Sequence, residues 1–382
     1  MAATGRQPQD TAASMTRPHA TTRRNATIDI ARGLGIILVV LGHNWIVLHE
    51  RGELFRVIYS FHLPLFFFLS GLFLKDSVRL GDFALSRADA LLKPYAVVLV
   101  LLGIAEMLAP KLVPVADTTP LAYFSGVLYA TAPTIAWTPL WFPPHLFVAT
   151  VFSLAILRAT RTLANRPAWL FVIACALLAT GIASIGRFWQ IDTAALHFMG
   201  QDRLPGLPWS LDLLFISTPC ILFGFLLARP VAEMRFNPLW FGAAALAFAA
   251  LHAFFDEAMD LNLRMYGNPL VSTLQAALGT YLALSASSLL QRFAAVQRPL
   301  AYIGAASLFI LLFHYVVQGR AFLVLSHFSR NEVLVGLASF VAGVLLPLLL
   351  LELVRRQRHV AALLLPRRTG PSVPPEPPGK LP

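Results

Sequence analysis

The sequence predicts an all-α, polytopic transmembrane helix bundle of about ten spans with both tails in the cytoplasm. Hydrophobic residues make up 57% of the 382 residues and charged residues only 13%, whereas a soluble domain carries about 25% charged residues. Apolar runs close to the ~20 residues that cross a bilayer recur along the chain, and basic residues gather between them. These observations exclude an ordinary globular protein and a disordered chain. The net charge of +11 needs no nucleic-acid partner, because membrane proteins carry positive loops.

Two tails are expected to flank one membrane domain of residues 25–354. Residues 1–24 are polar and lack the apolar core of a signal peptide, which indicates a flexible tail. Residues 355–382 are basic and rich in proline, which favours a disordered tail. Ten spans are expected in the domain: 28–48, 56–74, 91–109, 140–157, 168–186, 211–228, 238–255, 270–290, 299–319 and 333–352. Proline and glycine interrupt several spans, which helices in a bilayer tolerate.

The charges of the connections predict the orientation of these spans. With the N-terminus inside, the inner segments hold 21 Lys or Arg residues and the outer segments hold eight, as the positive-inside rule requires. Three outer segments, 110–139, 187–210 and 256–268, are long and carry aromatic and acidic residues such as Asp260. An interfacial belt with solvated charge is the favoured interpretation, and a rim that admits a polar acceptor from outside is the alternative.

Ionisable residues inside a span cost about 2.5–3.5 kcal/mol each and therefore need a reason. The first span contains Asp29, Arg32 and His43. Arg32 and His43 are eleven positions apart, so they share one stripe of a helix about 16 Å apart along its axis. Asp29 can pair with Arg32 across one turn. For Arg32 alone, snorkelling to the inner interface with Asp29 as its partner is the favoured interpretation, and His43 is either a packed histidine or a group for catalysis or proton transfer.

Four further polar residues are candidates for lining a substrate cavity. His62 lies in the second span toward the same side as His43, so the two rings can face each other. Ser70 in that span offers a small face for close helix approach. His314 lies within the ninth span, and Asp212 stands at the start of the sixth.

Two basic residues stand where the third span begins. Arg87 and Lys93 are explained by the positive-inside rule, or by binding of a phosphorylated cofactor from the cytoplasm. The chain has no phosphate-binding P-loop, no HExxH and no GxSxG motif. Cys175 and Cys220 cannot form a metal-binding CxxC, so no metal is expected.

Several motifs of the chain occur together in one known family. The most specific are Asp29-x-x-Arg32-Gly33, the pair Arg32-x10-His43, and the run Phe61-His62-Leu63-Pro64-Leu65-Phe66-Phe67-Phe68-x-Ser70-Gly71. Softer matches follow in the same order: LLKPY at 91–95, LWFP at 140–143, Leu204-Pro205 with WSLD at 209–212, and YIG…SL…LLFH at 302–314. Over residues 25–352 the chain resembles the integral-membrane acyltransferase 3 family, most closely the subgroup described as fucose 4-O-acetylase-like.

This resemblance implies ten helices, an acyl-CoA donor (usually acetyl-CoA), and a hydroxyl acceptor on a sugar, polysaccharide or glycolipid. It also implies an integral membrane protein of a bacterial inner membrane, with Arg32 and His43 as the functional pair. One departure stands out. The family usually carries two arginines three apart before the Leu-Leu-x-Pro-Tyr run, and here Arg87 is followed by Ala90. Arg87 with Lys93 then serves the donor, or the donor is held differently.

The working hypothesis is an O-acyltransferase in which His43 is the general base. Arg32, supported by Asp29, binds the donor or orients the site, and Arg87 and Lys93 hold the CoA phosphates. The alternative is a proton-coupled secondary transporter or flippase. Its relay would consist of Asp29, Arg32, His43 and His62. Such transporters tend to break matching helices in two halves, and no such match is evident. A purely structural membrane protein would leave Arg32 and His43 unexplained.

Overall fold

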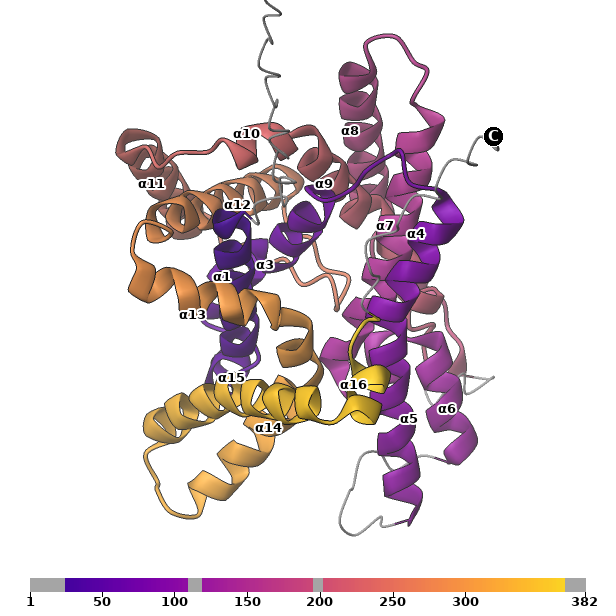
Figure 1. Cartoon of the computed structure of the whole chain (residues 1–382), viewed down its shortest axis with the longest axis vertical. Helices are drawn as coiled ribbons and strands as arrows, with labels where there is room; N and C mark the ends of the chain where they lie inside the picture. Colours follow the sequence, from indigo (N-terminus) through magenta and orange to yellow (C-terminus); the bar gives the residue numbers. More distant parts are fainter. Residues whose placement is uncertain (1–24, 109–118, 195–201, 368–382) are drawn as a thin grey trace, which may run out of the picture.

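The computed structural model describes residues 25–108, 119–194 and 202–367, which are helical and contain no β-strand (Figure 1). Seven helices in these ranges are long and apolar enough to cross a membrane: Glu53–Gly71, Leu80–Leu108, Thr138–Ala159, Arg166–Gln190, Pro208–Leu226, Ser307–Ser326 and Glu332–Arg356. The α11 helix, Pro238–Phe254, is apolar but shorter. The all-helical membrane fold is thus confirmed, whereas ten spans and cytoplasmic tails stay predictions.

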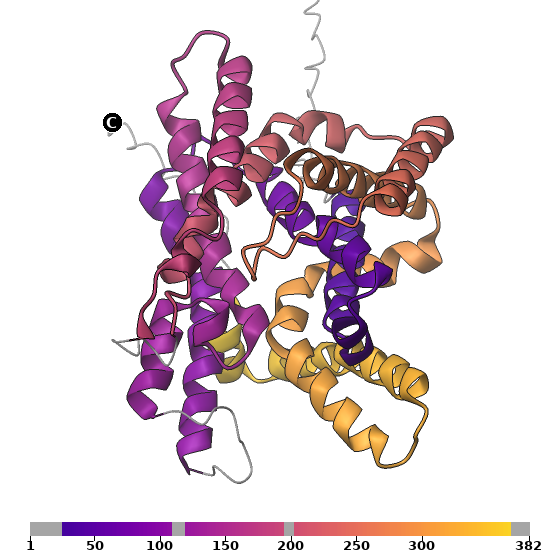
Figure 2. The same cartoon turned by 180° about the vertical axis from the view of Figure 1, so that it is seen from behind.

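The helices form two groups that meet along the centre of the molecule. In Figures 1 and 2, α1 stands upright in one group with α3, α12 and α13, above the pair α14 and α15, while α4 to α8 form the other group. The bounds are α1 Ala26–Gly42, α2 Trp45–Glu50, α3 Glu53–Gly71, α4 Leu80–Arg87, α5 Lys93–Leu108, α6 Pro120–Tyr129, α7 Phe142–Ala159, α8 Arg166–Ser184, α9 Leu214–Leu226, α10 Ala228–Ala232, α12 Pro269–Leu290, α13 Ala294–Ala305, α14 Ser307–Ser326, α15 Glu332–Arg356 and α16 Arg358–Leu364.

Two of the predicted spans are broken. The span expected at 28–48 divides at His43 and Asn44 into α1 and α2. Asn44 causes the second helix to begin, because its side chain accepts a hydrogen bond from the backbone N–H of Ile46 as an N-cap. The span expected at 299–319 divides at Ala306 into α13 and α14. In both cases hydropathy continues across a break that the backbone makes.

The basic connection between the spans expected at 56–74 and 91–109 is helical from Leu80. Its helix continues into α5 through a π-helical turn, η1, at Ala88–Leu92. A π turn shifts the register of a helix and often occurs beside functional residues. Arg87 and Lys93 therefore lie on one continuous helix, on either side of this turn.

Close backbone contact fixes α1 against α13. A Cβ atom at Gly33 would collide with the backbone oxygen of Leu300, and one at Gly304 would collide with the backbone oxygen of Asp29. Small residues allow such close approach between helices in a bilayer. The start of α1, which carries Arg32, is therefore held beside the break at Ala306.

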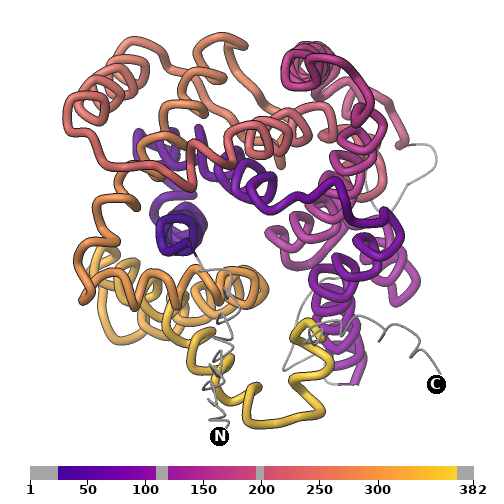
Figure 3. The backbone as a smooth tube through the Cα atoms, turned by 45° about the horizontal axis from the view of Figure 1, so that its top comes forward, coloured from indigo at the N-terminus to yellow at the C-terminus, as the bar shows by residue number. Residues whose placement is uncertain are grey.

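The C-terminal tail expected from residue 355 begins with ordered structure. The α15 helix extends to Arg356, and α16 lies beside α5 (Figure 3). The Nζ of Lys93 donates to the backbone oxygen of Leu365 at 2.7 Å, and the backbone N–H of Arg367 donates to the Asp89 carboxylate at 2.6 Å. The apolar side chains within 360–365 explain this order, because they pack against the core. The tail expected at 1–24, and the part of the expected C-terminal tail from 368 to 382, lie outside the described residues.

Candidate active site

A central cavity of about 190 Å³ lies where α1, α3, η1, α7 and α14 meet. Five residues singled out from the sequence line it: Arg32, His43, His62, Ser70 and Arg87. The cavity extends along α1 for most of three helical turns, since Arg32 and His43 are both in its wall and eleven residues separate them. One end is therefore cationic and the other carries imidazoles.

Backbone carbonyl groups determine which ring nitrogen carries the proton in the histidines at the imidazole end of the cavity. The Nδ1 atoms of His43, His62 and His314 lie 2.8, 2.8 and 3.1 Å from the carbonyl oxygen four residues earlier. A carbonyl oxygen only accepts, so Nδ1 carries the proton in each neutral ring. This leaves Nε2 of each ring with a free lone pair, the form that can take up a proton.

His43 is the meeting point of these rings. Its ring centroid is 5.2 Å from that of His314 and 6.3 Å from that of Tyr59, which is 4.8 Å from the ring of His62. His314 is fully buried behind His43 and does not line the cavity, and its Nε2 has no hydrogen-bond partner among the described residues. The structure thus brings together histidines from α1, α3 and α14.

The cationic end contains two guanidinium groups. Arg32 lies 4.0 Å from Asp29 and 4.6 Å above the ring of Phe73, and Arg87 lies 5.1 Å from the ring of Phe83. Asp29 is buried behind Arg32 and does not line the cavity, so its contact with the site runs through that arginine.

Lys93 lies away from the cavity. Its ammonium group pairs with Asp89 at 2.8 Å and donates to the backbone of Leu365. These two contacts direct its charge toward α16 rather than toward the cationic end of the cavity.

The connection between α11 and α12 supplies two residues that sequence reasoning did not place in the site. Asp260 and Asn262 line the central cavity. The Asp260 carboxylate accepts from the backbone N–H of Leu263 at 3.2 Å and is only 7% exposed as a residue. Burial raises the pKa of this carboxyl above its usual value. Solvated charge at the interface was the favoured interpretation of the acids in segment 256–268, but the structure buries Asp260 in the cavity wall.

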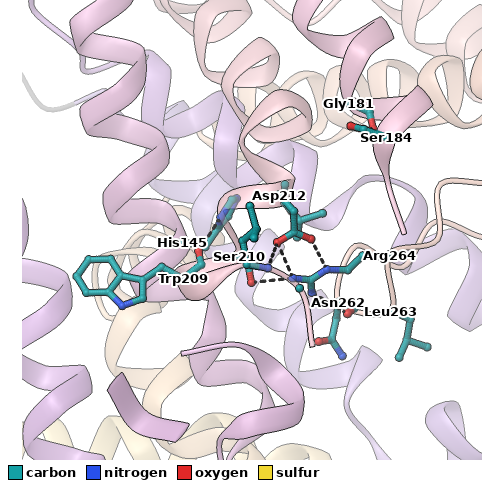
Figure 4. Close-up of polar contacts among 12 residues, drawn as sticks. His145, Gly181, Ser184, Trp209, Ser210, Asp212, Asn262, Leu263 and Arg264 are labelled. Carbon is teal, nitrogen blue, oxygen red and sulfur yellow. Dashed lines mark hydrogen bonds and ion pairs between the residues drawn. The ribbon is translucent and has the colours of Figure 1, made fainter. Parts of the chain in front are cut away.

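Asp212 does not line the central cavity. Its carboxylate forms a two-pronged ion pair with Arg264, with Nε–Oδ2 at 2.8 Å and Nη2–Oδ1 at 3.2 Å (Figure 4). Arg264 also donates to Ser210 Oγ at 3.2 Å. The pair fixes the segment that carries Asp260 and Asn262 to the turn before α9. The sequence showed Arg264 only as one charge of an outer segment.

His43 also borders a second cavity of about 540 Å³. Its wall includes Trp45, Trp137, Tyr315 and Arg320, from α2, α14 and the segment before α7. His43 therefore separates a narrow cavity with a cationic end from a wider one with aromatic walls.

Within the described residues, no three histidine, cysteine or acidic side chains are grouped so as to hold a metal ion. The protein therefore has several helices that can cross a membrane and an internal cavity lined by cationic and imidazole groups. It belongs to the class of polytopic membrane proteins with a polar site inside the helix bundle.

Comparison with protein families then identifies the chain more closely. Residues 25–352 match the acyltransferase 3 family, described as an acyltransferase domain. The chain belongs to this family and is a membrane acyltransferase. The family predicted from its motifs is confirmed over the same residues, while the fucose 4-O-acetylase-like subgroup stays a prediction. No curated protein and no solved structure matches the chain.

Proposed function

We propose that the protein moves an acetyl or other short acyl group from acyl-CoA to a hydroxyl of a sugar, polysaccharide or glycolipid in a bacterial inner membrane. The observation that carries this proposal is the position of His43 between two cavities, one of which leads to Arg32 and Arg87. A base between two cavities can meet a donor from one side and an acceptor from the other.

His43 is the general base of this mechanism. With Nδ1–H bonded to Val39, its Nε2 takes the proton of the acceptor hydroxyl. The freed oxygen attacks the thioester carbonyl, a tetrahedral intermediate forms, and the C–S bond breaks. The imidazolium then returns the proton to the leaving thiolate, so the ring ends neutral. Such a base contributes about 10²–10⁴-fold in rate.

The two cavities suit different reactants. The central cavity, at about 190 Å³, is smaller than the ~300–1,000 Å³ of sites that enclose a whole small molecule. It suits a narrow acyl-bearing arm that passes Arg32 and reaches His43. The second cavity is wider and has Trp45 and Trp137 in its wall, which suits the apolar faces and edge hydroxyls of a sugar ring.

The transporter alternative gains less support. Three members of its relay, Arg32, His43 and His62, line one cavity, whereas Asp29 lies behind Arg32. A chain of proton transfer would have to pass through a guanidinium, which does not release its proton at ordinary pH. Membership of an acyltransferase family also favours the enzyme.

The test compares His43→Gln and His43→Ala with His327→Ala, a control at an exposed position after α14. Hydrolysis of acetyl-CoA by the purified protein uses water as the acceptor, and mass spectrometry measures O-acetyl groups on the surface glycans of producing cells. Both His43 variants should lose about 10²–10⁴-fold in rate and the control none. Wild-type transfer by His43→Ala at equal protein level would refute the proposal.

A further inference from the structure

A third cavity of about 880 Å³ lies against the cationic end of the central one. Leu308 lines both cavities. Leu91 and Ser307 line the central cavity, and their chain neighbours Ala90 and Ala306 line the third one. The two cavities are therefore neighbours at the break between α13 and α14. Because of its charge, this third cavity is called the basic cavity.

Three arginines from the C-terminal segment line the basic cavity: Arg355, Arg358 and Arg367. No acidic residue of the described part of the chain is in its wall. Two nearby carboxylates contact two of these arginines: Glu352 pairs with Arg355, and Asp89, which pairs with Lys93 at 2.8 Å, lies 4.0 Å from Arg367. Among the described residues Arg358 has no ion pair. The wall thus carries three guanidinium groups, and no carboxylate of the described residues pairs with that of Arg358.

Contacts with α5 and η1 hold the backbone at the C-terminal end of this segment. The Lys93 ammonium binds the backbone oxygen of Leu365, and Asp89 accepts from the backbone N–H of Arg367. Figures 1 and 3 show α16 set beside α5 at this point. Arg358 and Arg367 therefore lie at opposite ends of an anchored segment and face one cavity.

We propose that the basic cavity binds the phosphate-bearing nucleotide half of the acyl donor, while the acyl arm passes Leu308 into the central cavity. This inference rests on the proposed acyl-CoA donor. A volume of 880 Å³ suits a nucleotide-sized ligand, and guanidinium groups are the side chains best matched to phosphate. All three arginines lie beyond residue 352, where the family match ends.

Ala90, which stands where the family usually carries a second arginine, lies in the wall of the basic cavity. No positive charge therefore enters from that position. Lys93, which could have compensated, is directed to Asp89 and Leu365. The charge of the cavity therefore comes from the C-terminal segment.

The test measures binding of coenzyme A to the purified full-length protein in detergent by calorimetry. Arg358→Gln and Arg367→Gln should each weaken binding about tenfold or more, the usual effect of losing a charge-assisted contact. The matched control is Arg356→Gln, a neighbouring arginine outside the cavity wall, which should bind as the wild type does. All three side chains are exposed, so the variants should fold normally.

Two further arms identify the ligand. Dephospho-coenzyme A, which lacks one phosphate, should bind the wild type more weakly than coenzyme A does. The arginine substitutions should also reduce the affinity for dephospho-coenzyme A less than they reduce the affinity for coenzyme A. A soluble anionic phospholipid should fail to displace coenzyme A. Unchanged coenzyme A binding by the Arg358→Gln/Arg367→Gln variant, or displacement by the phospholipid at equal concentration, would overturn the inference.

The outcome separates this inference from the proposed function. His43→Ala should bind coenzyme A normally and transfer no acyl group. If the wild-type protein binds coenzyme A in a way that depends on Arg358 and Arg367 but transfers no acyl group, the proposed function alone is refuted. Full transfer and binding in the Arg358→Gln/Arg367→Gln variant would sink the inference alone.

Discussion

Replacing Asp212 by asparagine should destabilise the protein strongly. The Asp212 and Arg264 side chains are 5% and 1% exposed and are joined by two contacts of 2.8 and 3.2 Å. The substitution keeps the shape but removes the negative charge, so a buried guanidinium remains without its counter-charge. Breaking a buried ion pair in this way costs about 3–5 kcal/mol of unfolding free energy. Ser210, whose hydroxyl accepts from Arg264, cannot supply that charge.

The measurement is unfolding of the purified protein by sodium dodecyl sulfate in mixed micelles, with wild type, Asp212→Asn, Arg264→Met and the double variant Asp212→Leu/Arg264→Met side by side. Removing both charges with residues of similar volume is often nearly neutral. The double variant should therefore be more stable than either single variant. Unfolding free energies of the single variants within about 0.5 kcal/mol of wild type, the range of an ordinary surface change, would refute this reasoning.

Two more perturbations test other parts of the site. Asn44→Leu removes the amide that donates to Gln318 Oε1 at 3.1 Å and to the backbone of Gly336 at 2.9 Å, so the same unfolding assay should show a loss of about 1–3 kcal/mol; stability equal to wild type would contradict it. For Asp260, the pKa raised by burial means that the folded state binds the proton more tightly, so stability from this group is present below the unfolded value of about 3.9 and is lost as pH rises through the higher folded value. Asp260→Asn should remove this decrease in unfolding free energy with rising pH. A difference in unfolding free energy between variant and wild type that does not change with pH would contradict this expectation.

The parts of the site that follow from local geometry could be predicted from the sequence. Arg32 and His43 line one cavity, as helical spacing indicates for two polar residues on one stripe. The placement of His62 beside them needed only two neighbouring antiparallel spans. These inferences depend on period and order alone, which the sequence contains in full.

Contacts made across the fold could not be predicted in this way. Asp212 and Arg264 are 52 residues apart, and nothing in either neighbourhood specifies the other as its partner. Lys93 likewise contacts the backbone oxygen of Leu365, 272 residues further along the chain, and nothing near Lys93 in the sequence indicates this partner. The apolar residues of α16 were visible in the sequence, and the prolines that follow them outweighed them in the expectation of a disordered tail.

The two breaks in predicted spans have a common physical meaning. Backbone groups freed by a helix break are tolerated at membrane depth only where protein covers them or a cavity provides polar partners. His43 follows the end of α1 between the central cavity and the second cavity, which has Trp45 and Trp137 in its wall. Ala306 follows the end of α13 where the central cavity meets the basic cavity. Hydropathy runs on through both positions, because apolar side chains surround a site whose polar groups are few. Each break therefore stands where two cavities meet, and the route proposed above for donor and acceptor, from Arg358 to Trp45, runs through both.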